Sequence, residues 1–389
     1  MKFYVADEKD IIDGNTTDIY FIRTRQILEE EHINKKVVAE VTIQNSQYPW
    51  LVFAGIEEVA RLMEGHNINI YSLPEGTIFR ESDSNKIPVP VMIIEGDYKE
   101  FSIFETAILG LICQSSGIAT KTARFKYRIG TKNLISFGVR RMHPVLAPMI
   151  DHYAFIGGCD AVSSVIGAKM LNIEPTGTMP HALILTVGEK EAWEKFDENI
   201  SKDVMRIALI DTFGDEKWSA IHAAETIKDL AGVRLDTPRS RKGDLSKIVR
   251  EVRWELDIRG YKNIKIYVSG GISEEDIKPL LEAGVDGFGI GTSISSAQTV
   301  DFSMDIVSVN GEPLAKKGKY GGKKEVYRCG SCLEYKVLKE GAKASDCSCG
   351  GKMKHAMVPV LKNGKIVYSF KDATKVREYV LEQLKKVSL

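Results

Sequence analysis

A series of strand–helix units between about residues 205 and 290 constrains the fold more than any other feature. Short apolar segments at 205–211, 232–236, 264–268 and 285–290 alternate with segments of helical pattern. In one of these, Leu245, Val249, Val252 and Leu256 recur every three or four residues, which places them on one helix face. Units that repeat about every 25 to 30 residues predict a parallel sheet with helices packed outside it.

Polar residues follow these strands directly, which favours closure of the sheet into a barrel, although an open doubly wound sheet fits the same pattern. We therefore expect an α/β protein with an irregular, incomplete α/β barrel over residues 106–301. An N-terminal α/β sandwich-like domain over residues 1–105, completed by 302–316, is expected to precede it. The Gly- and Lys-rich segment 315–324 is expected to be a solvated linker to a small C-terminal zinc-binding domain at 320–389.

Composition narrows the class of protein. The 389 residues include 53 Lys and Arg and 53 Asp and Glu, so no net charge attracts nucleic acid or an anionic membrane. No segment approaches the roughly 20 apolar residues of a membrane span. The N-terminal residues lack the apolar core of a signal peptide. We expect a cytoplasmic protein that binds neither nucleic acid nor membrane.

Four of the six cysteines crowd together near the C-terminus. Cys329 and Cys332 form a C-x₂-C pair, and Cys347 and Cys349 form a C-x-C pair fourteen residues later. Thiolates at this spacing can surround one tetrahedral Zn²⁺, and an iron centre with the same four ligands is the alternative. A closed four-sulfur site leaves no position for substrate, so we expect a structural zinc.

The ends of the predicted strands carry candidate phosphate and sugar ligands. Two glycine-rich turns follow the last two strands, one formed by Ser269, Gly270 and Gly271 and the other by Gly291 and Thr292. Such turns let backbone N–H groups approach phosphate oxygens. Because acidic residues follow the first turn at 273–276, we expect the second turn to be the closer contact. Asp211 and Asp236 either cap helices or bind ribose hydroxyls or Mg²⁺ and stabilise positive charge on a sugar ring.

Two further loops carry chemistry-bearing residues. Arg140 and Arg141 can bind a carboxylate or phosphate in a forked geometry, and Phe137 before them can stack on a flat ring. Pairing of these arginines with surface acids is the alternative. His181 lies in a loop of Gly, Thr and Pro residues that opens a helix, where an imidazole can act as acid, base or nucleophile toward a phosphoryl group. A loop histidine without a chemical role is the competing interpretation.

Together these motifs resemble nicotinate phosphoribosyltransferase, of the type II phosphoribosyltransferase group that also includes the quinolinate and nicotinamide enzymes. Val139 stands where the family usually has Thr, in the match to its Phe-Gly-Thr-Arg-Arg motif. The resemblance runs from Thr17 to about Lys317, and the matching segments are Asp18-x-Tyr20, Phe137 to Arg141, Gly177-Thr178-x-x-His181, Arg234-x-Asp236-Thr237 and the two glycine-rich turns.

The resemblance implies a reaction in which nicotinate and phosphoribosyl pyrophosphate form nicotinate mononucleotide and pyrophosphate, with Mg²⁺, as a step of NAD biosynthesis. It implies that ATP transiently phosphorylates His181 and that Asp211 and Asp236 hold the ribose or its metal. It also implies a homodimer or higher homo-oligomer in which the N-terminal part of one subunit closes the barrel of the next. The pyridine would contact Tyr20, Phe137, Arg140, Thr178 and Arg234, and the phosphoribosyl group would contact Ser240, Ser269, Gly270, Gly271, Gly291 and Thr292.

Three alternatives remain at this stage. A decarboxylating quinolinate phosphoribosyltransferase needs more cations around the pyridine and no phosphorylatable histidine. A nicotinamide phosphoribosyltransferase is the second alternative, because both pockets use aromatic side chains around the ring and the two substrates differ in the charge of one group. A nucleic-acid-binding role for the Lys-rich segment and the cysteine tail is disfavoured by zero net charge and by the lack of an aromatic and basic stripe.

Overall fold

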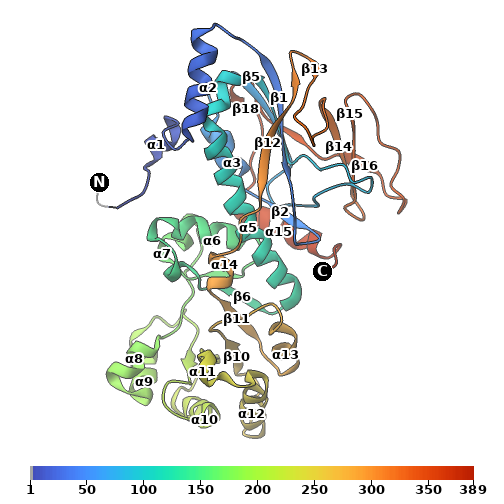
Figure 1. Cartoon of the computed structure of the whole chain (residues 1–389). Coiled ribbons are helices and arrows are strands. Elements are labelled where there is room, and N and C mark those ends of the chain that lie inside the picture. Colours follow the sequence, from blue (N-terminus) through green and yellow to red (C-terminus); the bar gives the residue numbers. More distant parts are fainter. Residues whose placement is uncertain (1–2) are drawn as a thin grey trace. The chain divides into compact units, whose positions relative to one another are not determined.

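The computed structural model describes residues 3–389, apart from the side chains of Arg239 and Lys242. The chain forms two compact units. Unit 1 combines the residues up to Ala123 with Gln298–Leu389, and unit 2 consists of Arg124–Ala297. The chain therefore leaves unit 1 once, builds unit 2 and returns (Figure 1).

Unit 2 contains the predicted parallel sheet. Its six strands lie in the order β7-β6-β11-β10-β9-β8, and every neighbouring pair is parallel. Because β7 and β8 are the outer strands and do not pair with each other, the sheet is a half-barrel rather than a closed barrel. The strands are β6 (Asn133–Ser136), β7 (Ala161–Val162), β8 (Ile207–Leu209), β9 (Gly232–Leu235), β10 (Lys265–Val268) and β11 (Gly287–Ile290).

The helices of unit 2 follow the expected pattern. In α12 (Leu245–Ile258), the four residues predicted to share one face are all buried, and the Asp244 side chain caps the first turn. The other helices are α6 (Ala147–Ile156), α7 (Val165–Leu171), α8 (His181–Val187), α9 (Glu189–Asn199), α10 (Glu216–Thr226), α11 (Arg239–Lys242), α13 (Ile277–Glu282) and α14 (Thr292–Ser295), with 3₁₀ turns at Val139–Arg141 and Pro144–Leu146.

Unit 1 is built on a seven-stranded antiparallel sheet of order β13-β12-β1-β5-β3-β17-β18. Three separated parts of the chain supply it, since β12 follows unit 2 and β17 follows the cysteine cluster. Its strands are β1 (Lys36–Ile43), β3 (Ile68–Ser72), β5 (Met92–Asp97), β12 (Phe302–Val309), β13 (Glu312–Pro313), β17 (Val358–Lys362) and β18 (Lys365–Ile366).

Two smaller sheets complete unit 1, one of β2 (Leu51–Phe53) and β4 (Thr77–Phe79) and one of order β15-β14-β16. The second of these consists of β14 (Lys324–Cys329), β15 (Tyr335–Lys339) and β16 (Met353–His355). Residues 320–389 thus share a unit, and through β17 a sheet, with the N-terminal strands. The helices are α1 (Glu8–Ile12), α2 (Ile19–Glu30), α3 (Ile56–Leu62), α4 (Tyr98–Phe101), α5 (Glu105–Ile129), whose last turns belong to unit 2, and α15 (Ala373–Leu384), with a 3₁₀ turn at Ser102–Phe104.

The segment 315–324 is not the solvated linker that its composition suggested. The ammonium group of Lys324 donates to both carboxylate oxygens of Glu40, at 2.8 and 2.9 Å, and both side chains are buried. Lys319 pairs with the buried Asp305 at 2.8 Å, and Lys316 pairs with the same carboxylate. Because buried carboxylates on β1 and β12 require counter-charges, these lysines bind to the sheet.

One helical segment was not anticipated. Tyr98–Ile129 is long and apolar enough, by length and composition, to cross a membrane, although no such segment was expected from the sequence. Half of its most apolar stretch is buried within the protein, and Ile108 and Ile112 belong to the core of unit 1. Burial of this kind is typical of the core helix of a globular domain.

Candidate active site

A pocket of about 640 Å³ lies where the strands of unit 2 end. Phe137 follows β6, Ser163 follows β7, Asp236 follows β9, and a glycine-rich turn follows each of β10 and β11. Ligands bind at this edge of parallel α/β sheets because loops there project side chains past the strands. The pocket brings together most of the predicted residues: Phe137, Arg140, Thr178, His181, Arg234, Asp236, Ser269, Gly270, Gly271, Gly291 and Thr292.

One side of the pocket combines an aromatic ring with a half-buried cation. A Cβ atom on Gly289 would lie 2.4 Å from ring carbons of Phe137, so only glycine at this position of β11 leaves space for the ring. The guanidinium of Arg234 lies 5.9 Å from the centre of that ring, and its Nη2 donates to the Met179 carbonyl at 3.2 Å.

Arg234 is an incompletely satisfied cation. Its Nε is buried and has no hydrogen-bond partner among the residues that the structure describes. Burial lowers the pKa of Arg234, while Asp236 and Asp211 act in the opposite direction. A buried guanidinium with an unused donor beside an aromatic face is suited to bind a planar carboxylate.

His181 opens α8 and faces two carboxylates. Its Nδ1 lies 3.0 Å from the hydroxyl of Thr212, and its Nε2 lies 3.9 Å from Asp211 Oδ1 and 3.8 Å from Asp236 Oδ2. No sequence pattern indicated the contact between Thr212 and His181. The hydroxyl contact leaves Nε2 as the ring nitrogen directed toward the carboxylates.

Asp211 lies behind the pocket surface rather than on it. Its Oδ2 accepts hydrogen bonds from the Asp236 backbone N–H at 2.6 Å and from the Thr237 hydroxyl at 2.8 Å. Its Oδ1 is buried and has no hydrogen-bond partner in the described part of the chain, although His181 Nε2 lies 3.9 Å away. Burial raises the pKa of Asp211, against the lowering effect of those hydrogen bonds and of His181.

The first glycine-rich turn is fixed by its backbone conformation. Gly270 and Gly271 have φ of +82° and +66°, in the left-handed region that favours glycine. A Cβ atom on Gly270 would also lie 2.8 Å from Asp236 Oδ1, and Ser269 Oγ donates to that same oxygen at 2.9 Å. The turn is thereby held against the carboxylate of the neighbouring strand.

The acids after this turn do not act as composition suggested. Glu274 is buried and pairs with Arg124 Nη2 at 2.8 Å and with Arg128 Nε at 3.0 Å. Asp276 accepts from the backbone and the hydroxyl of Ser273. Two arginines thus neutralise Glu274, which removes one of the acidic charges after this turn, and the preference for the second turn as the phosphate contact stays a prediction.

Several residues lie outside the group or were not anticipated. Ser240 is exposed on α11 and does not line the pocket. Tyr20 belongs to unit 1, where it is 56% exposed on α2. Ser163 and Met179 line the pocket but carry no sequence signal that separates them from ordinary loop residues.

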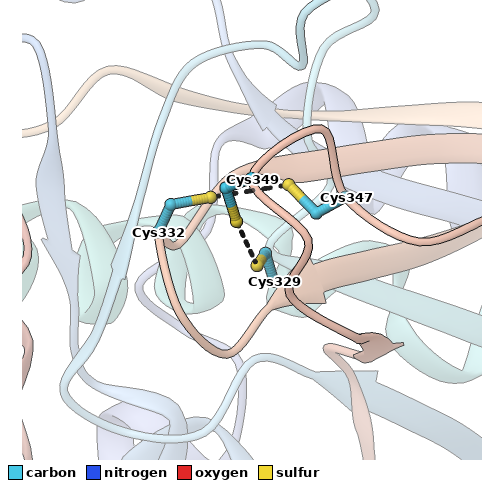
Figure 2. A group of neighbouring side chains, drawn as sticks. All are labelled: Cys329, Cys332, Cys347 and Cys349. Carbon is cyan, nitrogen blue, oxygen red and sulfur yellow. Dashed lines mark hydrogen bonds between the residues drawn. The ribbon is translucent and has the colours of Figure 1, made fainter.

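The four clustered cysteines of unit 1 form a candidate metal centre. Their sulfur atoms all lie within 4.8 Å of one another, with Cys329–Cys349 at 3.6 Å and Cys332–Cys347 at 3.5 Å (Figure 2). Four bonds of about 2.3 Å in a tetrahedron give sulfur separations of about 3.8 Å, close to these values. A Cβ on Gly351 would lie 2.6 Å from the Cys329 sulfur, so glycine there leaves space for the cluster. This group could hold a metal ion.

Two family models together match most of the chain. Residues 18–116 match the N-terminal domain of quinolinate phosphoribosyl transferase, and residues 118–305 match its C-terminal domain. A crystal structure of nicotinate-nucleotide pyrophosphorylase from Pyrococcus furiosus is 51% identical, covers 100% of both chains and superposes with a TM-score of 0.96.

More distant relatives carry another name. Nicotinate phosphoribosyltransferase from Bacillus subtilis is 28% identical in an alignment 320 residues long that covers 72% of this chain and 63% of the relative. The chain thus spans less than two thirds of that curated relative. A crystal structure of human nicotinic acid phosphoribosyltransferase has a TM-score of 0.72 at 16% identity, covers 96% of this chain and 94% of its own, and shows a shared fold.

Proposed function

Because the chain belongs to the type II phosphoribosyltransferase family, we propose that it is a nicotinate phosphoribosyltransferase. It joins nicotinate to phosphoribosyl pyrophosphate and releases nicotinate mononucleotide and pyrophosphate. The observation that carries this proposal is the half-buried Arg234, whose buried Nε has no hydrogen-bond partner among the described residues, beside the ring of Phe137. Phe137 can stack on the aromatic ring of a ligand, and Arg234 can bind one carboxylate attached to that ring.

In the proposed complex, the pyridine ring stacks on Phe137 and its carboxylate meets Arg234. Thr178 lines the ring site, and Arg140 contacts the carboxylate or the phosphate. A homodimer or higher oligomer would add Tyr20 of the partner subunit to the other ring face, which agrees with its exposure on α2. The amide of nicotinamide would leave the Arg234 charge uncompensated in a buried site.

The two glycine-rich turns are proposed to bind the 5-phosphate through backbone N–H groups, with Ser269 beside them. Ser240, which is exposed on α11 and does not line the pocket, stays the proposed contact of the segment 238–244 with the phosphoribosyl group. Asp236 lines the pocket, and Asp211 lies behind it with one buried oxygen that has no hydrogen-bond partner among the described residues, so we propose that this pair of carboxylates holds ribose hydroxyls or Mg²⁺. When bound, Mg²⁺ would neutralise charge on the leaving pyrophosphate.

The bond changes follow from the substrates. The lone pair of the pyridine nitrogen forms the new bond to C1 of the ribose. The bond from C1 to the pyrophosphate oxygen breaks, and its electron pair leaves with the pyrophosphate. The carboxylates of Asp211 and Asp236 stabilise the positive charge that develops on the ribose. No general base is required, because the ring nitrogen carries no proton when it attacks.

His181 is proposed to couple the reaction to ATP. With Nδ1 held by Thr212, Nε2 attacks the terminal phosphorus of ATP, the bond to ADP breaks, and a phosphohistidine results. The four cysteines are proposed to hold a structural Zn²⁺ that stabilises the C-terminal part of unit 1, since their spacing fits a tetrahedral ion.

The test is mononucleotide formation from nicotinate and phosphoribosyl pyrophosphate with Mg²⁺, with and without ATP, for wild type and His181→Ala. We expect product from wild type, stimulation by ATP, and loss of that stimulation in the variant. Product and CO₂ from quinolinate, with none from nicotinate, would assign the protein to the decarboxylating enzymes instead. Product formation that ATP does not change would support the proposed reaction and contradict the proposed phosphohistidine.

A further inference from the structure

We infer that Asp151, a buried residue of α6, is a positioning residue for Phe137 and Ser163. These two pocket-lining residues are called the pyridine-binding wall below. This inference rests on the proposed function, because it concerns how the pocket holds the pyridine ring. Asp151 is fully buried and does not line the pocket. Its role would therefore be exerted through the groups that it binds.

The carboxylate of Asp151 joins two strand ends. Its Oδ1 accepts from the hydroxyl of Ser136, the last residue of β6, at 3.0 Å. Its Oδ2 accepts from the backbone N–H of Ser164 at 3.1 Å and from the Ser164 hydroxyl at 2.5 Å. One carboxylate thus fixes the end of β6 and the loop between β7 and α7.

The residues next to these contacts are the ones that line the pocket. Phe137 follows Ser136 directly, and Ser163 precedes Ser164 directly. Each is a single residue away from a group held by Asp151, so its position depends on that hydrogen bond. Ser163 has an intermediate exposure and can present its hydroxyl to a ligand in the pocket.

The surroundings of Asp151 leave little space for rearrangement. A Cβ atom on Gly167 would lie 2.7 Å from the Asp151 carboxylate and 2.6 Å from Ser164 Oγ. Gly167 N–H also donates to Ser164 Oγ at 3.1 Å, which caps α7. The Ser164 hydroxyl therefore has one acceptor, Asp151, and one donor, Gly167, and it cannot turn away without losing both bonds.

Two substitutions separate positioning from bulk stability. Asp151→Ala leaves the Ser136 hydroxyl and both donors of Ser164 without their acceptor. Asp151→Asn keeps one oxygen for the Ser164 donors, and its amide N–H can donate to the Ser136 hydroxyl, which then acts as the acceptor. The asparagine variant should therefore preserve the wall.

A matched control lies at the opposite edge of the same parallel sheet. Asp286 accepts from Lys132 Nζ at 2.7 Å and from the Ile266 backbone N–H at 3.1 Å. It immediately precedes β11 at the end of the sheet away from the pocket, where hydrogen bonds serve stability. Asp286→Ala should weaken unit 2 without moving Phe137 or Ser163.

The experiment measures KM for the pyridine substrate and for phosphoribosyl pyrophosphate separately, together with Tm, for all three variants. For Asp151→Ala we expect the nicotinate KM to rise about tenfold or more, with the phosphoribosyl pyrophosphate KM within about twofold of wild type. Asp151→Asn should recover most of the nicotinate affinity. Asp286→Ala should lower Tm with both KM values unchanged.

Equal changes of both KM values in Asp151→Ala, or no change, would overturn the inference. If that variant does not fold, Ser136→Ala replaces it, and an unchanged nicotinate KM there has the same meaning. Wild type that converts quinolinate or nicotinamide instead of nicotinate would contradict the proposed function alone. The variants are then compared on that pyridine, because the wall argument applies to any ring bound there.

Discussion

Replacement of Lys324 by methionine should destabilise unit 1 in a pH-dependent way. The ammonium group donates to both oxygens of Glu40 and to the carbonyls of Tyr320 and Gly322, at 2.7 to 3.0 Å. Methionine has a similar length and no charge, so the change removes the cation while it fills most of the space. The Glu40 carboxylate is left buried in the sheet without that counter-charge.

The size of the effect follows from burial of both partners. The side chains of Lys324 and Glu40 are only 8% and 5% exposed, so solvent screens the pair little. Removal of one partner from a buried ion pair costs about 3–5 kcal/mol, because the other charge remains uncompensated. We expect a loss of about 3 kcal/mol at pH 8, toward the lower end since Glu40 can bind a proton.

The loss of stability in Lys324→Met should increase with pH. Burial already raises the pKa of Glu40 above 4.5, its ordinary value, against the lowering effect of Lys324. Without Lys324 the folded-state pKa rises further, while the unfolded value does not change. Between the two values the folded state binds more protons, so stability falls as pH rises, by about 1.4 kcal/mol per unit, up to the folded pKa. The loss should therefore be largest at pH 8 and small near pH 4.5.

Thermal unfolding at pH 5 and pH 8, with hydrogen exchange on β1 and β12 peptides, measures this effect. The double variant Glu40→Gln, Lys324→Met is the matched control, because it removes both charges and should recover much of the loss. A loss in Lys324→Met that is the same at both pH values, and that Glu40→Gln does not relieve, would refute the reasoning.

Three further predictions concern the pocket and the metal centre. Gly289→Ala should lower nicotinate turnover by displacing the ring of Phe137. Gly214→Ala is the control and should not lower it, because the added Cβ would approach no atom closer than 3.8 Å. Equal turnover in the two variants would contradict the steric argument. Arg234→Lys should raise the nicotinate KM roughly 10- to 100-fold in steady-state assays, since lysine lacks the forked donors, and an unchanged KM would remove Arg234 from carboxylate binding. Elemental analysis should find one zinc per chain, lost in Cys332→Ser together with about 5 °C or more of Tm; metal-free wild type would exclude the site.

Local sequence patterns were sufficient for the parallel sheet and for much of the pocket. The spacing of apolar residues in α12 and the apolar segments at β9, β10 and β11 depend on short-range periodicity, which a chain displays directly. Strand ends of a parallel sheet meet at one edge, so polar residues after several strands could be expected to share a pocket.

Residues that act through distant partners could not be found in this way. Asp151 lies in an apolar helix, and its contacts with Ser136 and Ser164 exist only once β6 and β7 pair. The Glu274 side chain looked like a source of repulsion until folding placed it between two arginines about 150 positions away. No periodic pattern encodes such pairs.

The sequence alone indicated the parallel sheet of unit 2, the cysteine cluster and most of the residues that line the pocket. The tertiary structure decided how three separated segments build one antiparallel sheet and why the Lys-rich segment binds to it. The physical reason is the distance along the chain over which each interaction acts. Hydrophobic periodicity acts over a few residues, whereas the ion pair of Glu40 and Lys324 joins positions 284 residues apart, and burial makes that pair depend on the complete fold.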